Sequence, residues 1–304
     1  MRQRRAFISF PEKHGLDVNL LNSQKVLDGL NIGFRVKVYG MAGVPSECTI
    51  DIYNLNREDL QFLTTSVSKW MSEPTLIQLY AGYDDDIDLL FGGQIMEAPP
   101  YGYPDLSLHL RCLPSATYMT KTIDIQKSNL KLVDLIDYTS SVTGYPVNIP
   151  AQLRRANETL NKKIDNFSYT GSVYNLMDKI QQMCGGFTIN GKSVFLSTMN
   201  DNTYVWTPEN NQKGEMLKVS EKSGMIGVPS LSAYGVDVKI LMNTKIHTGD
   251  TIYLESVRVP QANGKYYVTQ ITHEGELRGN AWYTTLNCTR YDALLGESDN
   301  GTKL

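Results

Sequence analysis

The segment Thr272–Cys288, THEGELRGNAWYTTLNC, contains the residue types that catalytic sites use. His273 is followed directly by a Glu, and a second Glu, an Arg and an Asn follow within a few positions. Zinc hydrolases use a His-Glu pair on a helix with a second His four residues after the first, so that both imidazoles face one metal. Here that position is Leu277, and the glycines at 275 and 279 disfavour a helix. The zinc motif therefore fails.

The same segment is better interpreted as a hairpin. Its strands would be YYVTQITHE and AWYTTLNC, with GELRGN as the connecting turn. We expect Gly279 and Asn280 in that turn, with a positive φ at Gly279 that would exclude a β-branched residue. Alternation along the second strand places one set of residues on its apolar face: Trp282, Thr284, Leu286 and Cys288. The segment would then contribute packing and not a reactive site.

An acidic run is the second candidate, formed by Asp84, Asp85, Asp86 and Asp88. An EF-hand calcium loop needs spaced oxygen ligands, a Gly at its sixth position and a Glu at its twelfth. Counting from Asp86, Glu97 is twelfth, but the sixth residue is Phe91. The calcium motif fails, and the run is expected in a solvated hairpin loop.

Other catalytic and ligand-binding motifs are missing. The sequence has no GxSxG element and no phosphate-binding loop of the GxxxxGK[ST] or GxGxxG type. Glycoside hydrolysis needs two carboxylates about 5 to 10 Å apart, and nothing in the sequence marks such a pair. The histidines are isolated, and the cysteines are far apart and expected to be reduced and mostly buried: His14, His109, His247, His273, Cys48, Cys112, Cys184 and Cys288. We predict no catalytic, cofactor-binding or metal-binding residue, and no cofactor.

Composition indicates an ordinary globular protein. The 304 residues carry a net charge of -3, which gives no general nucleic-acid-binding surface. The start MRQRRAF lacks the apolar core of a secretory signal, and no segment has the roughly 18 apolar residues of a membrane span. We expect a soluble chain that is made in a cytoplasm and does not insert into a membrane.

Alternating apolar residues predict strands in the first third, at 34–40, 47–55, 75–83, 89–97 and 105–113. In the last of these, one face would carry Leu106, Leu108, Leu110 and Cys112. Asn56 is expected to cap a short helix after the second strand. Strands separated by turn residues in this way favour a sandwich or barrel.

The middle of the chain, from about 125 to 200, has a different pattern. Apolar residues at helical spacing predict helices within 129–144 and 171–186, the second capped by Ser172. Asn190–Gly191, between two apolar runs, predicts a type I′ hairpin turn. This region is interpreted as a small α/β insert whose apolar stripes form its core.

Strands return in the last third, at 235–243, 249–259, 264–274 and 280–291. Thr75–Cys112 and Thr251–Cys288 align without a gap at an offset of 176, which is 288 minus 112. The identities are Thr75/Thr251, Gln94/Gln270, Ile95/Ile271, Leu110/Leu286 and Cys112/Cys288. Because the order of strands and loops also matches, we expect two related β-domains separated by the insert.

Residues 120–292 resemble the baseplate hub proteins of phage tails, which are related to the late control protein D group. The resemblance rests on SEKSGMIGVPSLSAYGVDVKILMNTKIHTGDTIYLES, on GKYYVTQITHEGELRGNAWYTTLNC and on the middle segment FSYTGSVYNLMDKIQQMCGGFTINGKSVFLS. The first third agrees in strand order and in FGGQI, which is less specific.

This resemblance implies an α+β, mainly β fold with two tail-tube-like antiparallel β-barrel or sandwich domains. The domains would span 1–122 and 216–295, with the α/β insert at 123–215 and a flexible tail at 296–304. Three chains would form a homotrimer, whose six similar barrels continue a six-fold tail tube as a pseudo-six-fold ring.

The implied location is the tail baseplate of a virion, assembled in the host cytoplasm. The implied partners are the trimeric tail spike (needle) protein, the tail tube protein, other baseplate proteins, and DNA that passes non-specifically through the channel during ejection. A mildly acidic chain suits such a channel, because a lumen that attracted phosphates would retard passage.

Two other functions stay open. The chain could be a cell-wall glycan-binding or peptidoglycan-degrading tail-tip protein, although no extra segment has the size of a peptidoglycan-cleaving domain. It could also be the hub of a phage-like contractile injection system. The resemblance assigns no catalytic residue, so we predict a structural protein and not an enzyme. Contractile and non-contractile tails, the host, bound ions, and the residues that face the spike or the lumen are not distinguished by the sequence.

Overall fold

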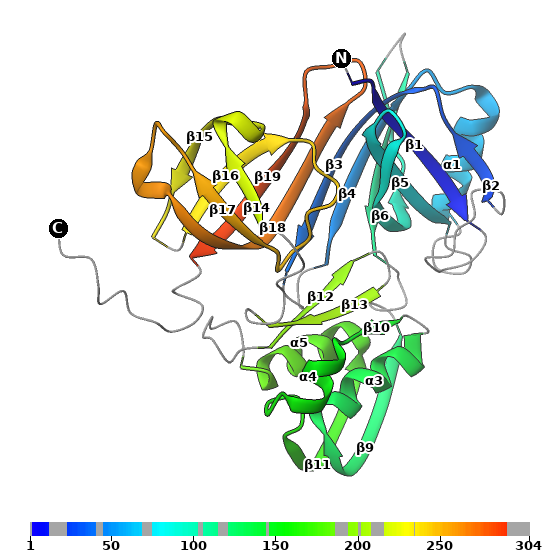
Figure 1. Ribbon diagram of the computed structural model, residues 1–304. Coiled ribbons are helices and arrows are strands. Elements are labelled where there is room, and N and C mark those ends of the chain that lie inside the picture. Colours follow the sequence, from blue (N-terminus) through cyan, green and yellow to red (C-terminus); the bar gives the residue numbers. More distant parts are fainter. Residues whose placement is uncertain are drawn as a thin grey trace.

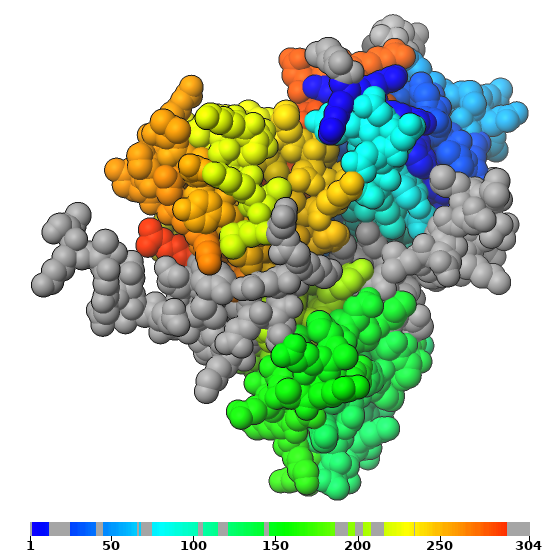
Figure 2. Space-filling model, viewed as in Figure 1, coloured from blue at the N-terminus to red at the C-terminus, as the bar shows by residue number. Residues whose placement is uncertain are grey.

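The computed structural model describes residues 2–11, 23–40, 45–68, 75–102, 106–114, 121–143, 146–185, 194–199, 202–207, 216–233 and 235–290. Most of them form antiparallel strands, which confirms the expected mainly β fold class. Figure 1 shows a large β body with a smaller mixed α/β part below it, and in Figure 2 this part protrudes as a lobe. His14, the Asn190–Gly191 turn and the tail 296–304 lie outside the described residues.

The large sheet takes its strands from both ends of the chain. The first part supplies β1 (Arg4–Pro11), β2 (Ser23–Leu27), β3 (Asn31–Tyr39), β4 (Glu47–Tyr53), β5 (Leu76–Tyr83), β6 (Asp86–Glu97), β7 (Pro100–Tyr101) and β8 (Ser107–Leu113), with helix α1 (Arg57–Ser68). The last part supplies β14 (Leu217–Ser220), β15 (Met225–Leu231), β16 (Gly235–Leu241), β17 (Thr251–Glu255), β18 (Gly264–Glu276) and β19 (Trp282–Arg290), with short 3-10 turns η2 (Glu221–Ser223) and η3 (Pro260–Ala262). Its main path runs β15-β16-β19-β18-β3-β4-β8-β6-β5-β1-β2.

The alternation of apolar residues explains these strands. In β4, Cys48, Ile50 and Ile52 are fully buried while the residues between them are not, which is the pattern of a strand with one face on a core. Asn56 caps α1 as expected, because its Oδ1 accepts the N–H of Asp59 at 2.8 Å. One assignment was wrong: Leu106 precedes β8 and is 39% exposed, so it does not share the buried face of that strand.

The middle lobe has its own hydrophobic core. It contains β9 (Thr122–Lys131), α3 (Leu132–Thr143), β10 (Val147–Asn148), α4 (Ala151–Ala156), β11 (Lys163–Ser172), α5 (Val173–Met183), β12 (Phe195–Met199) and β13 (Asn202–Trp206). The expected helices are α3 and α5, and Ser172 caps α5 by accepting the N–H of Asn175 at 3.2 Å. Strands β9 and β11 pair with each other, and neither these two strands nor α4 was predicted.

The two parts of the large sheet repeat one strand order. The first part runs β3-β4-β8-β6-β5, and the last runs β15-β16-β19-β18-β17. Each contains a bulge at the same place: Ile95 and then Glu97 face Cys112 and Arg111, while Val268 and then Gln270 face Cys288 and Asn287. This correspondence supports the expected internal repeat.

The sequence alignment assumed a repeat without gaps, but the strand pairing shows that the repeat contains a gap. The offset between Cys112 and Cys288 holds for β8 and β19, since Leu110 and Leu286 also occupy matching positions. In β6 and β18, however, Ile95 matches Val268 and not Ile271, so the offset there is three residues shorter. The loop between the shared bulge and the following strand is three residues longer in the last part, which accounts for the difference.

Strand β3 joins the two parts by pairing with β18 from Gln270↔Tyr39 to Glu276↔Gly33. Side chains lock the junction from outside the ladder. Arg4 Nη1 donates to the carbonyl oxygens of Gly279 at 2.8 Å and Glu276 at 3.3 Å, and its guanidinium carbon lies 5.6 Å from the ring centroid of Trp282.

The acidic run adds to this junction. Asp84 and Asp85 form the turn of the β5–β6 hairpin, as expected. The carboxylate of Asp86 pairs with Lys245 at 2.7 Å, and that of Asp88 accepts the hydroxyl of Thr244 at 2.6 Å. The run therefore connects the first part of the sheet to the last part, in addition to forming a hairpin.

The hairpin at Thr272–Cys288 is present, with β18 ending at Glu276 and β19 beginning at Trp282. The expected apolar face of β19 is buried. The expectation of a positive φ at Gly279 was wrong, because this residue is not among those with positive φ. Glycine is favoured there because a Cβ would collide with the Glu276 side chain.

His273 lies in the core of this hairpin and is 4% exposed. Its Nδ1 is 2.9 Å from the hydroxyl of Thr284, which also accepts the backbone N–H of Asn243 at 3.0 Å. Burial lowers the pKa of His273 from 6.5 to about 4, with a smaller effect from His247. The imidazole is therefore neutral near pH 7 and acts as a polar packing residue.

His273 should make the folded state sensitive to acid. In the unfolded chain its pKa returns to 6.5, so between about pH 6.5 and 4 only the unfolded chain binds the proton. We expect full stability above pH 6.5 and a loss of about 3 kcal/mol from this residue as the pH falls to 4. Urea unfolding from pH 7 to 4 should show a clearly shallower loss in His273→Gln. Equal pH dependence in the two proteins would contradict the buried neutral imidazole.

Arg4→Ala should destabilise the fold by about 1–2 kcal/mol, because two charge-assisted hydrogen bonds and a cation–π contact at the junction are lost. Arg5→Ala is the matched control. Arg5 pairs with Asp28 at 3.6 Å across side chains that are 41% and 57% exposed, so its loss should cost under about 0.5 kcal/mol. Urea midpoints at unchanged slope measure both effects. Similar losses in the two variants would mean that Arg4 does not lock the junction.

Candidate functional site

One face of the large sheet is polar across both parts of the chain. A row of neighbouring residues crosses β19, β18, β3, β4, β8 and β6 in register: Tyr283, Glu274, Arg35, Thr49, Arg111 and Glu97. The adjacent row, pointing to the opposite side, is buried: Thr284, His273, Val36, Cys48, Cys112 and Ile95. Because successive side chains alternate, the sheet has one core face and one polar face.

The charges on this polar face are largely paired within it. Arg35 Nε lies 3.0 Å from Glu274 Oε1, and Arg111 Nη1 donates to Glu97 Oε1 at 2.9 Å. On neighbouring rows, His109 Nδ1 lies 2.7 Å from Asp51 Oδ1. Among the described residues, the face carries Glu47, Asp51, Glu97, Asp237, Glu274 and Glu276 against Arg35, Lys37, Arg111, Lys239 and Lys265. The face is therefore polar, with acidic and basic groups close to balance.

Tyr283 connects two of these charged groups. Its hydroxyl hydrogen-bonds Glu274, and this contact together with burial raises the pKa of the Tyr283 hydroxyl. Lys239 Nζ lies 4.0 Å from the centroid of the Tyr283 ring. This cation–π contact holds the Lys239 ammonium group against the ring, so the group is less available to bind an anion.

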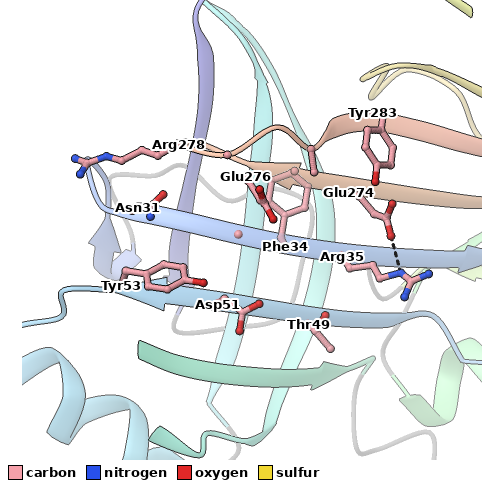
Figure 3. A pocket seen from close by; sticks show the side chains of 14 residues that line it. Asn31, Phe34, Arg35, Thr49, Asp51, Tyr53, Glu274, Glu276, Arg278 and Tyr283 are labelled. Atoms are coloured by element: carbon pink, nitrogen blue, oxygen red, sulfur yellow. Dashed lines mark ion pairs between the residues drawn. The ribbon is translucent and has the colours of Figure 1, made fainter. Parts of the chain in front are cut away.

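A pocket of about 480 Å³ is hollowed into the polar face at the junction of the two parts. Figure 3 shows Arg35 and Glu274 joined across it, with Asp51 and Tyr53 on β4 and Arg278 from the β18–β19 loop at its margin. Its floor is the β3–β18 ladder. The pocket is a polar hollow in the open face of the sheet, and the Arg35 and Glu274 side chains in it are paired with each other.

A second pocket, of about 440 Å³, lies between the middle lobe and the loop before β17. Trp206, stacked on Phe195 at 4.6 Å between ring centroids, contributes to its wall together with His247 and Asp250. The backbone N–H of His247 donates to Asp250 at 2.7 Å. Asp250 therefore orders this loop locally.

The residues that suggested chemistry in the sequence do not converge. Alternation sends His273 into the core and its neighbour Glu274 onto the polar face. Within the described ranges, no group of three His, Cys, Asp or Glu side chains is arranged to hold a metal. The four cysteines are free and buried as expected, and burial raises their thiol pKa values, that of Cys184 to about 12.

The polar face itself was not predicted as a unit. Its strands were found from alternation, but the register that aligns Glu274 with Arg35 joins residues far apart in the chain. None of the helices in the described part of the chain has the length and apolarity needed to cross a bilayer.

Comparison with known proteins gives a family and a fold. The family model described as baseplate hub gp41 matches residues 15–288. A search of curated proteins found no match.

Among solved structures, the tail protein from Neisseria meningitidis MC58 is similar with a TM-score of 0.65 and 7% identity, over 97% of this chain and 99% of that one. The prophage MuSo2 43 kDa tail protein from Shewanella oneidensis has a TM-score of 0.63 and 8% identity, over 96% and 98%. A third similar structure is the E. coli c3393 protein, with a TM-score of 0.57 and 10% identity, over 87% of this chain and 74% of that one. That protein is described as a component of the type VI secretion system with structural similarity to the T4 tail proteins gp27 and gp5.

At these identities the structural matches show a shared fold, and the family model spans nearly the whole sheet and the middle lobe. The chain therefore belongs to the baseplate hub gp41 family of phage tail proteins.

Proposed function

We propose that this chain is the structural hub of a phage tail baseplate, and that three copies form a pseudo-six-fold ring between the tail tube and the spike. The supporting observation is the repeated strand order, with a bulge at the same position, in the two parts of one sheet. Two similar units per chain give six around a trimer, which suits a six-fold tube on one side and a three-fold spike on the other.

In this proposal residues 1–122 and 216–295 are the two tube-type domains, and 123–215 is the insert that forms the protruding lobe. The tail tube, the spike and other baseplate proteins are its partners. The ring would be assembled in the host cytoplasm before it enters the virion.

The polar face is proposed to line a channel for DNA. Proteins bind DNA without sequence preference mainly by releasing counterions from phosphates at unpaired Lys and Arg side chains. Here Arg35 and Arg111 pair with carboxylates and Lys239 lies on an aromatic ring. Such a surface can face DNA closely without holding it.

We propose no catalytic role. The alternative of a peptidoglycan-degrading or glycan-binding tail-tip protein receives no support from the site, because Glu274 and Asp51 are tied to basic neighbours on an open surface. A hub of an injection system related to phage tails is a second candidate. The fold shared with the E. coli type VI secretion component favours it over the enzyme.

The ring makes a direct prediction about mass. Purified protein should reach three times the 34.1 kDa of one chain, alone at high concentration or together with the spike, and should give rings in negative-stain images. Light scattering behind a sizing column measures this. A protein that stays monomeric at every concentration, both alone and with the spike, would contradict the ring.

Reversing charges on the proposed channel face should slow genome release. Glu97→Lys with Glu274→Lys frees two arginines and adds two lysines on this face, so phosphates would be retained, more strongly at low salt. Glu58→Lys with Glu158→Lys is the control, because these exposed residues lie in α1 and after α4. We expect slower dye-detected release only in the first variant, from particles of equal yield. Equal rates in the two would remove this face from the channel.

A further inference from the structure

The internal repeat identifies a second strand that matches β3. Val36 of β3 faces Cys48, which faces Cys112. In the last part of the sheet, Leu231 of β15 faces Val236, which faces Cys288. Since Cys112 and Cys288 occupy the same place in the repeat, Leu231 is the counterpart of Val36, and β15 is the counterpart of β3.

The partner of β3 has a counterpart as well. His273 of β18 faces Thr284, four residues before Cys288. Pro100 of β7 faces Leu108, four residues before Cys112. Pro100 is therefore the counterpart of His273, and residues 91–101 of β6 and β7 correspond to residues 264–274 of β18.

Within the chain, β3 and β18 pair and bury their residues. Val36 lies opposite His273, and these side chains are 0% and 4% exposed. Phe34 lies opposite Gly275 and is 5% exposed, with its ring edge-on to Trp282 at 5.6 Å between centroids. The corresponding residues of β15 and β7 can be compared with this buried contact.

The counterparts of Val36 and His273 are apolar but exposed. On β15, Leu231 is 45% exposed, and at β7, Pro100 is exposed. Two apolar neighbours lie outside this register: Val228, in the irregular stretch between Ile226 and Ser230, is 52% exposed, and Tyr101, which matches Glu274 on the polar face, is 58% exposed. Among the described residues, β15 pairs only with β16, and β7 only with β8. Two open strand edges thus carry apolar side chains at the positions that the β3–β18 contact covers.

We propose that β15 of one protomer docks against the edge formed by the end of β6 and β7, residues 97–101, of the next protomer. The contact would repeat the β3–β18 contact, with Leu231 opposite Pro100 of the neighbouring copy. This inference rests on the proposed ring and names its subunit interface. Because the two edges differ, the contact is head-to-tail, the kind that closes rings.

The observations favour a second copy of this chain as the partner of each open edge. The two open edges correspond to two strands, β3 and β18, that already pair within the chain. A second copy of the chain therefore supplies the matching edge, and no other protein is needed. Pro100 has no N–H, and proline is accepted at strand edges but interrupts a ladder. The interface should therefore depend on apolar packing of Leu231 against Pro100 as much as on backbone hydrogen bonds.

Cysteine cross-linking tests this register. Residues opposite each other on adjacent antiparallel strands have Cα atoms about 4.5 or 5.5 Å apart, and both distances suit a disulfide. Pro100→Cys with Leu231→Cys should give, after mild oxidation, dimer and trimer bands on a non-reducing gel and nothing larger. Either single variant should stay a monomer on the gel. Pro100→Cys with Val257→Cys is the control, because Val257 is 82% exposed in a loop outside both edges.

The outcomes separate this interface from the ring itself. A trimer by light scattering with no cross-link, or with as much cross-link in the control, contradicts the edge assignment and leaves the ring standing. Dimers formed by Leu231→Cys alone would indicate a two-fold contact and contradict the head-to-tail arrangement. A monomer by light scattering at all concentrations, alone and with the spike, contradicts the ring and the interface together. Unchanged urea midpoints verify that the variants fold.

Discussion

The pairing of β3 with β18 is the constraint on which the rest of the structure depends. It joins segments more than two hundred residues apart into one sheet. Because side chains alternate with a period of two, its register decides which residues face the core and which face outward, and a slip of one residue would reverse every position. Arg4 and the Asp86–Lys245 pair hold the same junction from outside the ladder. The polar face and its pocket exist only because this register is fixed.

The same alternation explains why a catalytic-looking sequence forms no site. His273 and Glu274 are adjacent in the chain, but they lie on opposite faces of the sheet. The imidazole packs against the Thr284 hydroxyl, while the carboxylate pairs with Arg35. On a strand, neighbours in sequence diverge in space, so groups that could act together must come from alternate positions or from other strands.

Sequence reasoning found what local physics determines. Alternation located β3, β4, β16 and β19, and capping residues located the starts of α1 and α5. It missed β9 and β11, where exposed polar residues hide the apolar positions, and it missed the longer loop after the bulge in β18, which shifts the repeat by three residues. Charge pairs such as Arg35–Glu274 could not be predicted, because they depend on the register of strands that are distant in the chain. Gly279 was correctly predicted to lie in the β18–β19 loop, but the predicted positive φ was wrong. A Cβ is disfavoured there because it would collide with the Glu276 side chain.

The two halves of the repeat are alike on one face and different on the other. Three buried pairs at the centre of the repeat remain apolar: Ile50 and Val238, Leu110 and Leu286, Ile95 and Val268. On the polar face, the Arg111–Glu97 ion pair of the first half corresponds to Asn287 and Gln270 in the second. A closely packed core tolerates few changes of volume, whereas an exposed face can vary freely. In the proposed ring, the six similar domains would therefore carry two different sets of polar side chains, which alternate around the channel. The fold would repeat six times, whereas the pattern of surface charges would repeat three times.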